Sequence, residues 1–411
     1  MKRNFITEFL LLIILGGLTS LSLPPLNLFI LNFFTLSIFF GFLFKKLKNR
    51  NEKKIFFFYG WFFGFGYFLT NLYWITISLT FDKNLSFLMP IALILIPSFL
   101  GLFYGLITLI FYLYNPKNIL SAFFGFSVLF GFIEFIRGTI LTGFPWNLVI
   151  YSFSKNLNFL SILSIIGTYS LNLIVISFFT APAIYILRKT KKEIGVCIFL
   201  LFLPIIFFAY GNLNEKKFKN KKVKDNSYTI RIIGSNISLD RFYNNIQTEK
   251  VINELISISS PESNKITFFV WPEGIIPNTH QDEIVLYKDI FNKSFNKNHI
   301  IGFGITKKNL KNDEYKFYNS FSIFNNELNL IENYNKINLV PFGEFLPFEK
   351  ILNSIGLKTI TNNFGSFSKG NERNVIEINN ILFKELKFLP LICYEIIYSG
   401  NLSKNSNFDF I

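Results

Sequence analysis

The sequence predicts two parts, a polytopic α-helical membrane domain followed by a layered α/β domain. Hydrophobic residues make up 51% of the 411-residue chain, and their excess is concentrated before about residue 211. The apolar stretches there approach the roughly 20 residues that a helix needs to cross a bilayer. Beyond a basic linker at 212–227, short apolar runs surround a helical pattern, which is typical of a layered α/β domain over 228–411.

The apolar stretches of the first part, residues 1–211, predict about seven membrane spans. A cleaved signal peptide is the alternative for the first stretch, but no small-residue cleavage site follows it, so we expect it to remain as an anchor. The spans are expected at 5–23, 29–44, 55–79, 87–113, 119–141, 157–187 and 194–210.

Lysine and arginine occur mainly in alternate loops. The rich loops contain Lys2, Arg3, 45–54, Lys117 and 188–193, and the other loops hold little beyond Lys83 and Lys155. Positively charged short loops remain in the cytoplasm. We therefore expect a multi-pass membrane protein with the N-terminus inside and residues 228–411 outside. In a bacterium with two membranes, the protein would lie in the inner membrane and this outer part in the periplasm.

The formal net charge of +15 is interpreted as a topology signal and as attraction to anionic lipid headgroups. Nucleic acid, the alternative partner of a basic chain, is not expected for an extracytoplasmic domain. The two cysteines, Cys197 in the seventh span and Cys393 in the second part, do not form a disulfide framework. No metal or cofactor motif is present, so none is expected.

The second part is expected to contain several short strands and at least one helix. The helix is predicted around 242–258. The strands are predicted at 228–236, 265–274, 298–306, 317–325, 374–383 and 386–395.

Cys393 is a candidate nucleophile at the end of the last predicted strand. Its alternative is a small buried hydrophobic residue, the commoner fate of a free cysteine. Tyr394 and Glu395 follow it directly. Residues two apart in a strand share one face, so Cys393 and Glu395 are expected to point the same way, as a site requires.

A cysteine nucleophile needs a base and a group that stabilises an oxyanion. His280 and His299 occur in no recognisable arrangement, so a carboxylate is the better candidate. Glu273 follows a fully apolar strand, where lost hydration is expected to raise its pKa toward that of a general base. The alternative is a solvent-facing glutamate in a turn.

Lys336 and Glu344 lie in "NYNKINLVPFGEFLPF", a stretch shaped by proline and glycine. A fixed ammonium group near a thiolate and a carboxylate can stabilise a developing oxyanion. A solvated surface lysine is the alternative, since lysines are rarely buried.

The order Glu273, Lys336, Cys393 resembles the Glu-Lys-Cys triad of the nitrilase superfamily. Behind a multi-span membrane domain, the chain resembles the apolipoprotein N-acyltransferase family in particular. The matching stretches are 64–75, 134–147 and 166–176 in the first part, and 234–238, 271–274, 334–348, 367–370 and 393–398 in the second.

This resemblance implies an α-β-β-α sandwich and a two-step acyl transfer without a cofactor. Cys393 would take an acyl group from a phospholipid such as phosphatidylethanolamine, and the amine of a diacylglyceryl apolipoprotein would then receive it. Glu273 would be the general base and Lys336 the oxyanion stabiliser. Glu344, Tyr394 and Glu395 would support them. Separately, we expect the protein to act as a monomer.

The resemblance also implies where lipid is contacted and how far the family's chains extend. Phe242 stands where the family often has tryptophan, and is expected to contact substrate together with Phe348. The amphipathic stretch 345–356 is expected to dip into the membrane interface, with core packing as the alternative. Family members continue beyond the residue matching Ile411 to an eighth span, so we expect the chain to be C-terminally incomplete.

Two other functions remain as alternatives. A membrane-tethered amidase would share the triad but use water, and a transporter or receptor would have no catalysis. A transporter predicts ionisable sites deep in several spans, whereas Glu134 and Arg137 form nearly the only such pair. These two residues share a helix face at i and i+3, and we expect a structural pair.

Overall fold

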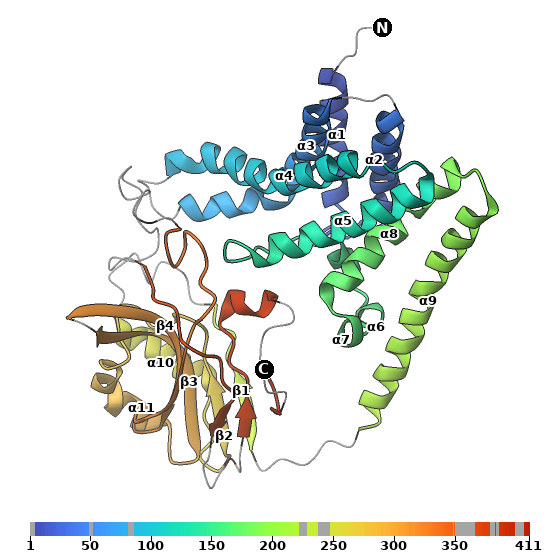
Figure 1. The fold of residues 1–411 in the computed structure, drawn as a ribbon. Coiled ribbons are helices and arrows are strands. Elements are labelled where there is room, and N and C mark those ends of the chain that lie inside the picture. Colours follow the sequence, from blue (N-terminus) through green and yellow to red (C-terminus); the bar gives the residue numbers. More distant parts are fainter. Residues whose placement is uncertain are drawn as a thin grey trace. The chain divides into compact units, whose positions relative to one another are not determined.

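The computed structural model describes residues 5–48, 52–80, 86–221, 228–236, 247–311, 313–347, 349, 366–378, 383, 386–398 and 407–411. The chain divides into two compact units, Met1–Lys222 and Val223–Ile411. Figure 1 shows the first as helices only and the second as strands with helices.

The first unit contains helices of very different lengths. Its longer helices are α1 (Phe5–Ser20), α2 (Leu31–Lys48), α3 (Lys53–Leu72), α4 (Met89–Tyr114), α5 (Ile119–Thr139), α8 (Thr168–Leu187) and α9 (Lys191–Lys219). Its short elements are η1 (Tyr73–Thr80), η2 (Ser86–Leu88), η3 (Val149–Phe153), α6 (Leu157–Leu160) and α7 (Leu163–Ile166).

Among the described residues, five helical stretches are long and apolar enough to cross a membrane: 53–80, 86–114, 119–139, 168–187 and 191–219. Helix α1 has only 16 residues, and α2 carries three lysines in its last turn. The predicted span 157–187 is not one helix, because α7 ends at Gly167, whose φ of 76° suits glycine. The count of seven spans therefore stays a prediction.

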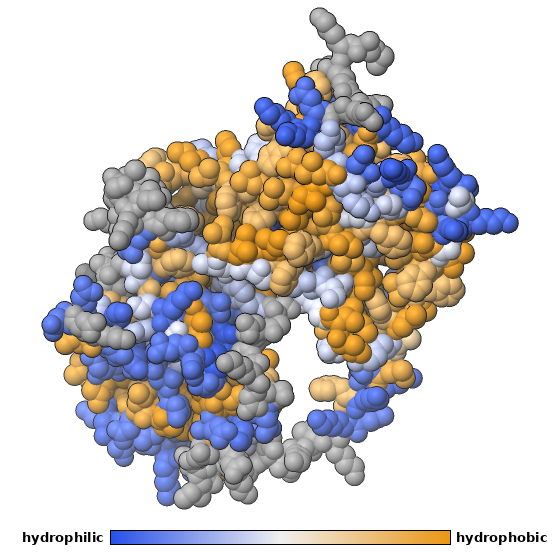
Figure 2. Space-filling model, viewed as in Figure 1, coloured by the Kyte–Doolittle hydropathy of each residue, from blue (hydrophilic) through white to orange (hydrophobic). Residues whose placement is uncertain are grey.

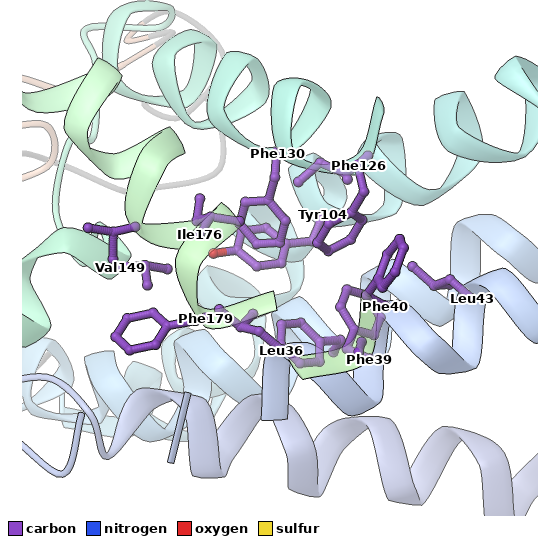
Figure 3. Packing of buried hydrophobic residues seen from close by; sticks show 14 of the residues in the cluster. Leu36, Phe39, Phe40, Leu43, Tyr104, Phe126, Phe130, Val149, Ile176 and Phe179 are labelled. Atoms are coloured by element: carbon purple, nitrogen blue, oxygen red, sulfur yellow. The ribbon is translucent and has the colours of Figure 1, made fainter. Parts of the chain in front are cut away.

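Aromatic side chains fill the core of the helical unit. Figure 3 shows phenylalanines of α2, α5 and α8 around Tyr104 of α4. The rings of Phe39 and Phe63 stack nearly parallel, with their centroids 4.0 Å apart. Gly60 of α3 lies against the Tyr104 carbonyl, where a Cβ would collide. Apolar side chains also cover much of the visible surface of this unit, with hydrophilic patches at its upper end (Figure 2), as expected of helices that face lipid.

Glu134 and Arg137 form a buried ion pair inside this unit, each side chain being 1% exposed. Arg137 also donates to the carbonyl oxygen of Phe144 at 2.6 Å, and its guanidinium lies 5.2 Å from the ring centroid of Phe68. The pair neutralises two charges that are unfavourable at this depth and ties the end of α5 to the loop after it, as expected of a structural pair.

The second unit is built on a five-stranded mixed sheet in the order β1-β2-β3-β4-β5. The first three strands are parallel, and the last two pairings are antiparallel. The strands are β1 (Thr229–Ile232), β2 (Thr267–Val270), β3 (His299–Lys311), β4 (Glu314–Asn325) and β5 (Leu330–Asn335). The sequence analysis did not predict β5, whose side chains are largely polar.

Two apolar clusters give this unit its layers. On one face of the sheet, residues of β2 and β3 pack against helices α10 (Thr248–Ser259) and α11 (Lys288–Ser294). The other face packs against a two-stranded sheet of β6 (Ile376–Ile378) and β7 (Leu386–Phe388). The described residues thus form three layers, one of helices and two of strands. The second helical layer of an α-β-β-α sandwich stays a prediction.

Candidate active site

Glu273 lies just beyond the C-terminal end of β2, where the chain leaves the sheet. Gly304 of the neighbouring strand makes this position possible, because a Cβ at residue 304 would lie 2.6 Å from the Glu273 Cα. The Glu273 side chain is 34% exposed, so one part of its carboxylate faces protein and another faces open space. It is therefore neither fully buried nor a freely solvated turn residue.

Lys336 follows β5 and is only 1% exposed, which excludes the surface alternative. Its Nζ lies 2.9 Å from Glu344 Oε1 and 3.4 Å from Glu273 Oε1. Burial by itself lowers the pKa of Lys336, but the two carboxylates outweigh it and hold the pKa above its ordinary value. The ammonium form is therefore the one present at neutral pH.

Asn319 of β4 joins the two carboxylates from the other side. Its Nδ2 donates to Glu273 Oε1 at 2.6 Å and to Glu344 Oε1 at 2.5 Å. The backbone carbonyl oxygen of Asn319 accepts a hydrogen bond from the Lys336 backbone N–H at 2.8 Å. The sequence analysis missed Asn319, because an asparagine in a strand looks like any polar residue until its neighbours are placed.

Glu344 is the fixed member of the group. Besides Lys336 and Asn319, its Oε2 accepts from the Val340 backbone N–H at 2.8 Å. Three donors therefore hold the carboxylate in place, which in turn orients Lys336. Glu273, with more exposure, is the better placed of the two for proton transfer.

Cys393 does not lie in a strand, so the expectation that it shares a strand face with Glu395 is wrong. Strand β7 ends at Phe388, and Pro390 has no backbone N–H with which to continue the sheet hydrogen bonds. Cys393 then begins a 3-10 turn over Cys393–Ile397. Cys393 has a φ of 49°, unusual for a residue other than glycine. Its side chain is exposed, so the alternative of a buried core thiol is also wrong.

Glu395 is fully buried and holds this turn against the segment after Lys336. Its Oε1 accepts from the backbone N–H groups of Ile337 at 2.9 Å and Asn338 at 3.0 Å. Its Oε2 accepts from the Ile392 N–H at 3.0 Å, and the Tyr334 hydroxyl donates to both oxygens. Such contacts are what maintain a strained φ at a functional residue.

Arg373 completes the network around Glu395, and it too was missed by the sequence analysis. Its Nη2 lies 2.6 Å from Glu395 Oε1 and 2.9 Å from Asn338 Oδ1, and its Nε donates to the Tyr334 hydroxyl at 3.0 Å. Burial alone lowers the pKa of Arg373, but Tyr334 and Glu395 raise it above the ordinary value. Burial and Glu395 together raise the pKa of Tyr334, which stays a neutral donor.

The electrostatic environment of the Cys393 thiol links it to the other groups. Partial desolvation by surrounding atoms raises its pKa, and Glu273 raises it further by its charge and by a hydrogen bond. Lys336 and a hydrogen bond from the Tyr394 backbone act in the opposite direction. The net pKa lies above that of an ordinary cysteine, so the resting thiol is protonated and a base beside it is needed.

We expect two substitutions to move the pKa of Cys393 in opposite directions. Glu273→Gln removes a negative charge and should lower it, whereas Lys336→Met removes a positive charge and should raise it. Only the thiolate reacts with iodoacetamide, so the pH midpoint of Cys393 alkylation, followed by peptide mass spectrometry, measures the shift. The exposed-lysine variant Lys265→Met is the control, and shifts of the same sign in both site variants would contradict this assignment.

Phe242 and Phe348 are outside the described residues, as is most of the stretch 345–356, so their expected contacts stay predictions. The His299 ring is buried and hydrogen-bonds to the Glu262 carbonyl oxygen at 3.0 Å, and its burial lowers its pKa. His299 therefore has a structural role, in line with the preference for a carboxylate base.

Two family descriptions match the chain. "Apolipoprotein N-acyltransferase N-terminal domain" matches residues 15–181, and "Carbon-nitrogen hydrolase" matches residues 229–407. The boundary between them falls where the two compact units meet in sequence.

Curated relatives match over both units. A protein named apolipoprotein N-acyltransferase from Brucella suis is 28% identical over 354 residues, which cover 84% of this chain and 64% of the relative. Relatives of the same name from Rhodopseudomonas palustris and Rhizobium leguminosarum are 28% and 26% identical, with 66% and 76% of their length covered. The chain therefore spans about two thirds of the length of these relatives. Together with the five apolar helices, they indicate a multi-pass membrane protein.

Proposed function

The chain belongs to the apolipoprotein N-acyltransferase family within the nitrilase superfamily, and from this premise we propose that it carries an acyl group from a phospholipid to an apolipoprotein through a thioester on Cys393. One observation carries the proposal. A buried lysine, two carboxylates and an exposed thiol meet beside the C-terminal end of β2. No hydrolysis of a soluble amide requires the apolar helices that precede this site.

In the first step, Glu273 takes the proton of the Cys393 thiol, and the sulfur attacks the ester carbonyl carbon of the phospholipid. The negative charge that develops on the carbonyl oxygen is stabilised by the Lys336 ammonium and by the Tyr394 backbone N–H. The C–O bond then breaks. The lysophospholipid oxygen leaves with the proton held by Glu273, and the acyl group stays on sulfur.

In the second step, the free α-amine of a diacylglyceryl-cysteine attacks the thioester carbonyl carbon. Glu273 takes a proton from the amine, the same donors stabilise the oxyanion, and the C–S bond breaks. The proton returns from Glu273 to the departing sulfur, which restores the thiol. The product is an amide at the N-terminus of the apolipoprotein, and no cofactor takes part.

Several finer assignments belong to this proposal. The catalytic domain, residues 228–411, lies in the periplasm behind seven spans of the inner membrane and adopts the α-β-β-α sandwich. Phosphatidylethanolamine is the donor, Phe242 and Phe348 contact lipid, and Glu344, Tyr394 and Glu395 support the triad. A monomer suffices, because the whole triad comes from one chain. Membrane burial keeps the acyl chains out of water, where each exposed methylene is unfavourable by about 0.8 kcal/mol.

The test is mass spectrometry of the peptide that contains Cys393. The full chain, in vesicles of phosphatidylethanolamine, is expected to gain the mass of one acyl group, and hydroxylamine should remove it. Cys393→Ala should gain nothing, and Glu273→Gln should gain it far more slowly. Transfer to a synthetic diacylglyceryl lipopeptide then tests the second step. Loss of the adduct to water at the same rate without the lipopeptide would favour an amidase and contradict acyl transfer.

A further inference from the structure

A cavity of about 460 Å³ lies between α5, α8 and α9 of the helical unit, and none of its lining residues belongs to the candidate active site. Its walls are apolar apart from one lysine and two serines. The lining residues are Phe123, Phe124, Ser127, Val128, Leu173, Ser177, Lys192, Gly195, Val196, Phe199 and Leu200.

The cavity is open to the surroundings of the unit. Phe124, Val128 and Phe199 on its rim are each more than half exposed. At Gly195, a Cβ would find no heavy atom within 4 Å, so glycine leaves the entrance wide. Helices α5, α8 and α9 are each long and apolar enough to cross a membrane, and α9 lies at the edge of the unit (Figure 1). The medium around the cavity is therefore lipid.

Two polar groups of the lining, the Ser127 hydroxyl and the Lys192 ammonium group, favour a lipid with matching polar groups over a plain acyl chain. The Ser127 hydroxyl is buried and has no hydrogen-bond partner among the described residues, although it lines the cavity. Ser177, in contrast, is satisfied, because its hydroxyl donates to the Leu173 carbonyl oxygen at 2.9 Å. A buried hydroxyl in hydrocarbon is unfavourable without a hydrogen-bond acceptor. A molecule bound in the cavity would therefore be stabilised if it placed an acceptor beside Ser127.

Lys192 supplies a positive charge at one end of the cavity. It is exposed, and no described carboxylate pairs with it. The adjacent Glu193 is engaged in a capping box, in which it accepts from the Thr190 backbone N–H at 2.9 Å. Arg188 and Lys189, which precede α9, and Lys191, in its first turn, add positive charge near Lys192 in the sequence. An anionic group in the headgroup layer would therefore be attracted to this end.

We propose that this cavity binds one anionic phospholipid of the leaflet on the Lys192 side. The lipid phosphate pairs with Lys192, an ester carbonyl oxygen accepts a hydrogen bond from Ser127, and an acyl chain lies along Val196 and Phe199. From Lys192 to Phe199 the helix rises roughly 10 Å, within one half of a hydrocarbon layer about 30 Å thick. The proposal depends on the membrane helices alone and does not require the acyltransferase function.

Native mass spectrometry of the full chain in detergent tests this binding. The chain is titrated with phosphatidylglycerol and, separately, with phosphatidylcholine of the same acyl chains. We expect one phosphatidylglycerol to bind about fivefold more tightly than phosphatidylcholine, the preference expected from one lysine near a charged headgroup. Lys192→Gln should abolish that preference, and Ser127→Ala should weaken the binding of both lipids. Gly195→Phe, which fills the entrance, should remove the bound lipid of either kind.

The neighbouring exposed residue gives the matched control. Lys191 is the neighbour of Lys192 in the first turn of α9 but does not line the cavity, so Lys191→Gln removes an equal charge and should keep the preference. Equal losses in Lys191→Gln and Lys192→Gln would mean diffuse surface attraction and overturn the proposal. Undiminished binding in Gly195→Phe would overturn it too. So would displacement of the lipid by glycerol phosphate, which has no acyl chain.

Discussion

Lys336→Met is expected to lower kcat/KM for acyl transfer about 10²- to 10³-fold, the effect of removing one oxyanion donor from a preorganised site. Methionine nearly fills the volume of the lysine side chain, so the change removes charge rather than packing. Lys336 is 1% exposed and contacts both Glu273 and Glu344. Its loss leaves two carboxylates facing each other, which also opposes ionisation of Cys393.

The measurement is the initial rate of lipopeptide acylation in phosphatidylethanolamine vesicles at several acceptor concentrations. Lys265→Met is the control, because the Lys265 side chain is half exposed and forms a surface ion pair with Glu262, a type of pair worth about 0–1 kcal/mol. It should retain full activity. A Lys336→Met protein with unchanged kcat/KM would remove Lys336 from the mechanism.

Arg373→Met is expected to release the turn that carries Cys393. Removing one partner of a buried ion pair destabilises by about 3–5 kcal/mol, because the other charge is left buried and unpaired. Arg373 and Glu395 are 8% and 0% exposed, and Arg373 also holds Tyr334 and Asn338. We expect amide hydrogens of residues 392–398 to exchange on the order of 10²- to 10³-fold faster.

Hydrogen exchange read by mass spectrometry suits this test, since a two-unit membrane protein does not unfold in one step. Arg373→Lys should recover only part of the protection, because an ammonium group cannot reach Glu395, Tyr334 and Asn338 together. Lys387→Met, which removes an exposed pair with Glu377, should leave 392–398 unchanged. Equal protection in Arg373→Met and the parent would show that other contacts hold the turn.

Most of the membrane helices were predictable from the sequence, because runs of apolar residues leave few alternatives. The break inside 157–187 was not, since Gly167 looks like an ordinary helix glycine until its positive φ is known. Strand β5 was missed for the opposite reason. Its sequence "LIENYN" is mostly polar, and pairing with β4 rather than its own pattern makes it a strand.

Some of the site residues named from the sequence lie close together in the structure. The residues that hold them in place could not be predicted from the sequence. Glu273, Lys336 and Glu344 lie within hydrogen-bond distances of one another or of Asn319. The apolar residues before Cys393 predict a strand through it, but the strand ends at Phe388, before Pro390, and Cys393 begins a 3-10 turn. Asn319 and Arg373 act across long sequence separations, which residue spacing does not reveal.

The separation between the site's parts also governs when the chain can acquire a reactive thiol. Lys336 contacts a carboxylate 63 residues earlier, and Glu395 contacts a backbone amide 58 residues earlier. Closing such loops is slow, because their entropy is lost before the contacts form. Before these contacts form, Cys393 therefore lacks the neighbouring Glu273 and Lys336 that alter the pKa of its thiol. The proposed acylation of the thiol has to wait until the second unit has folded.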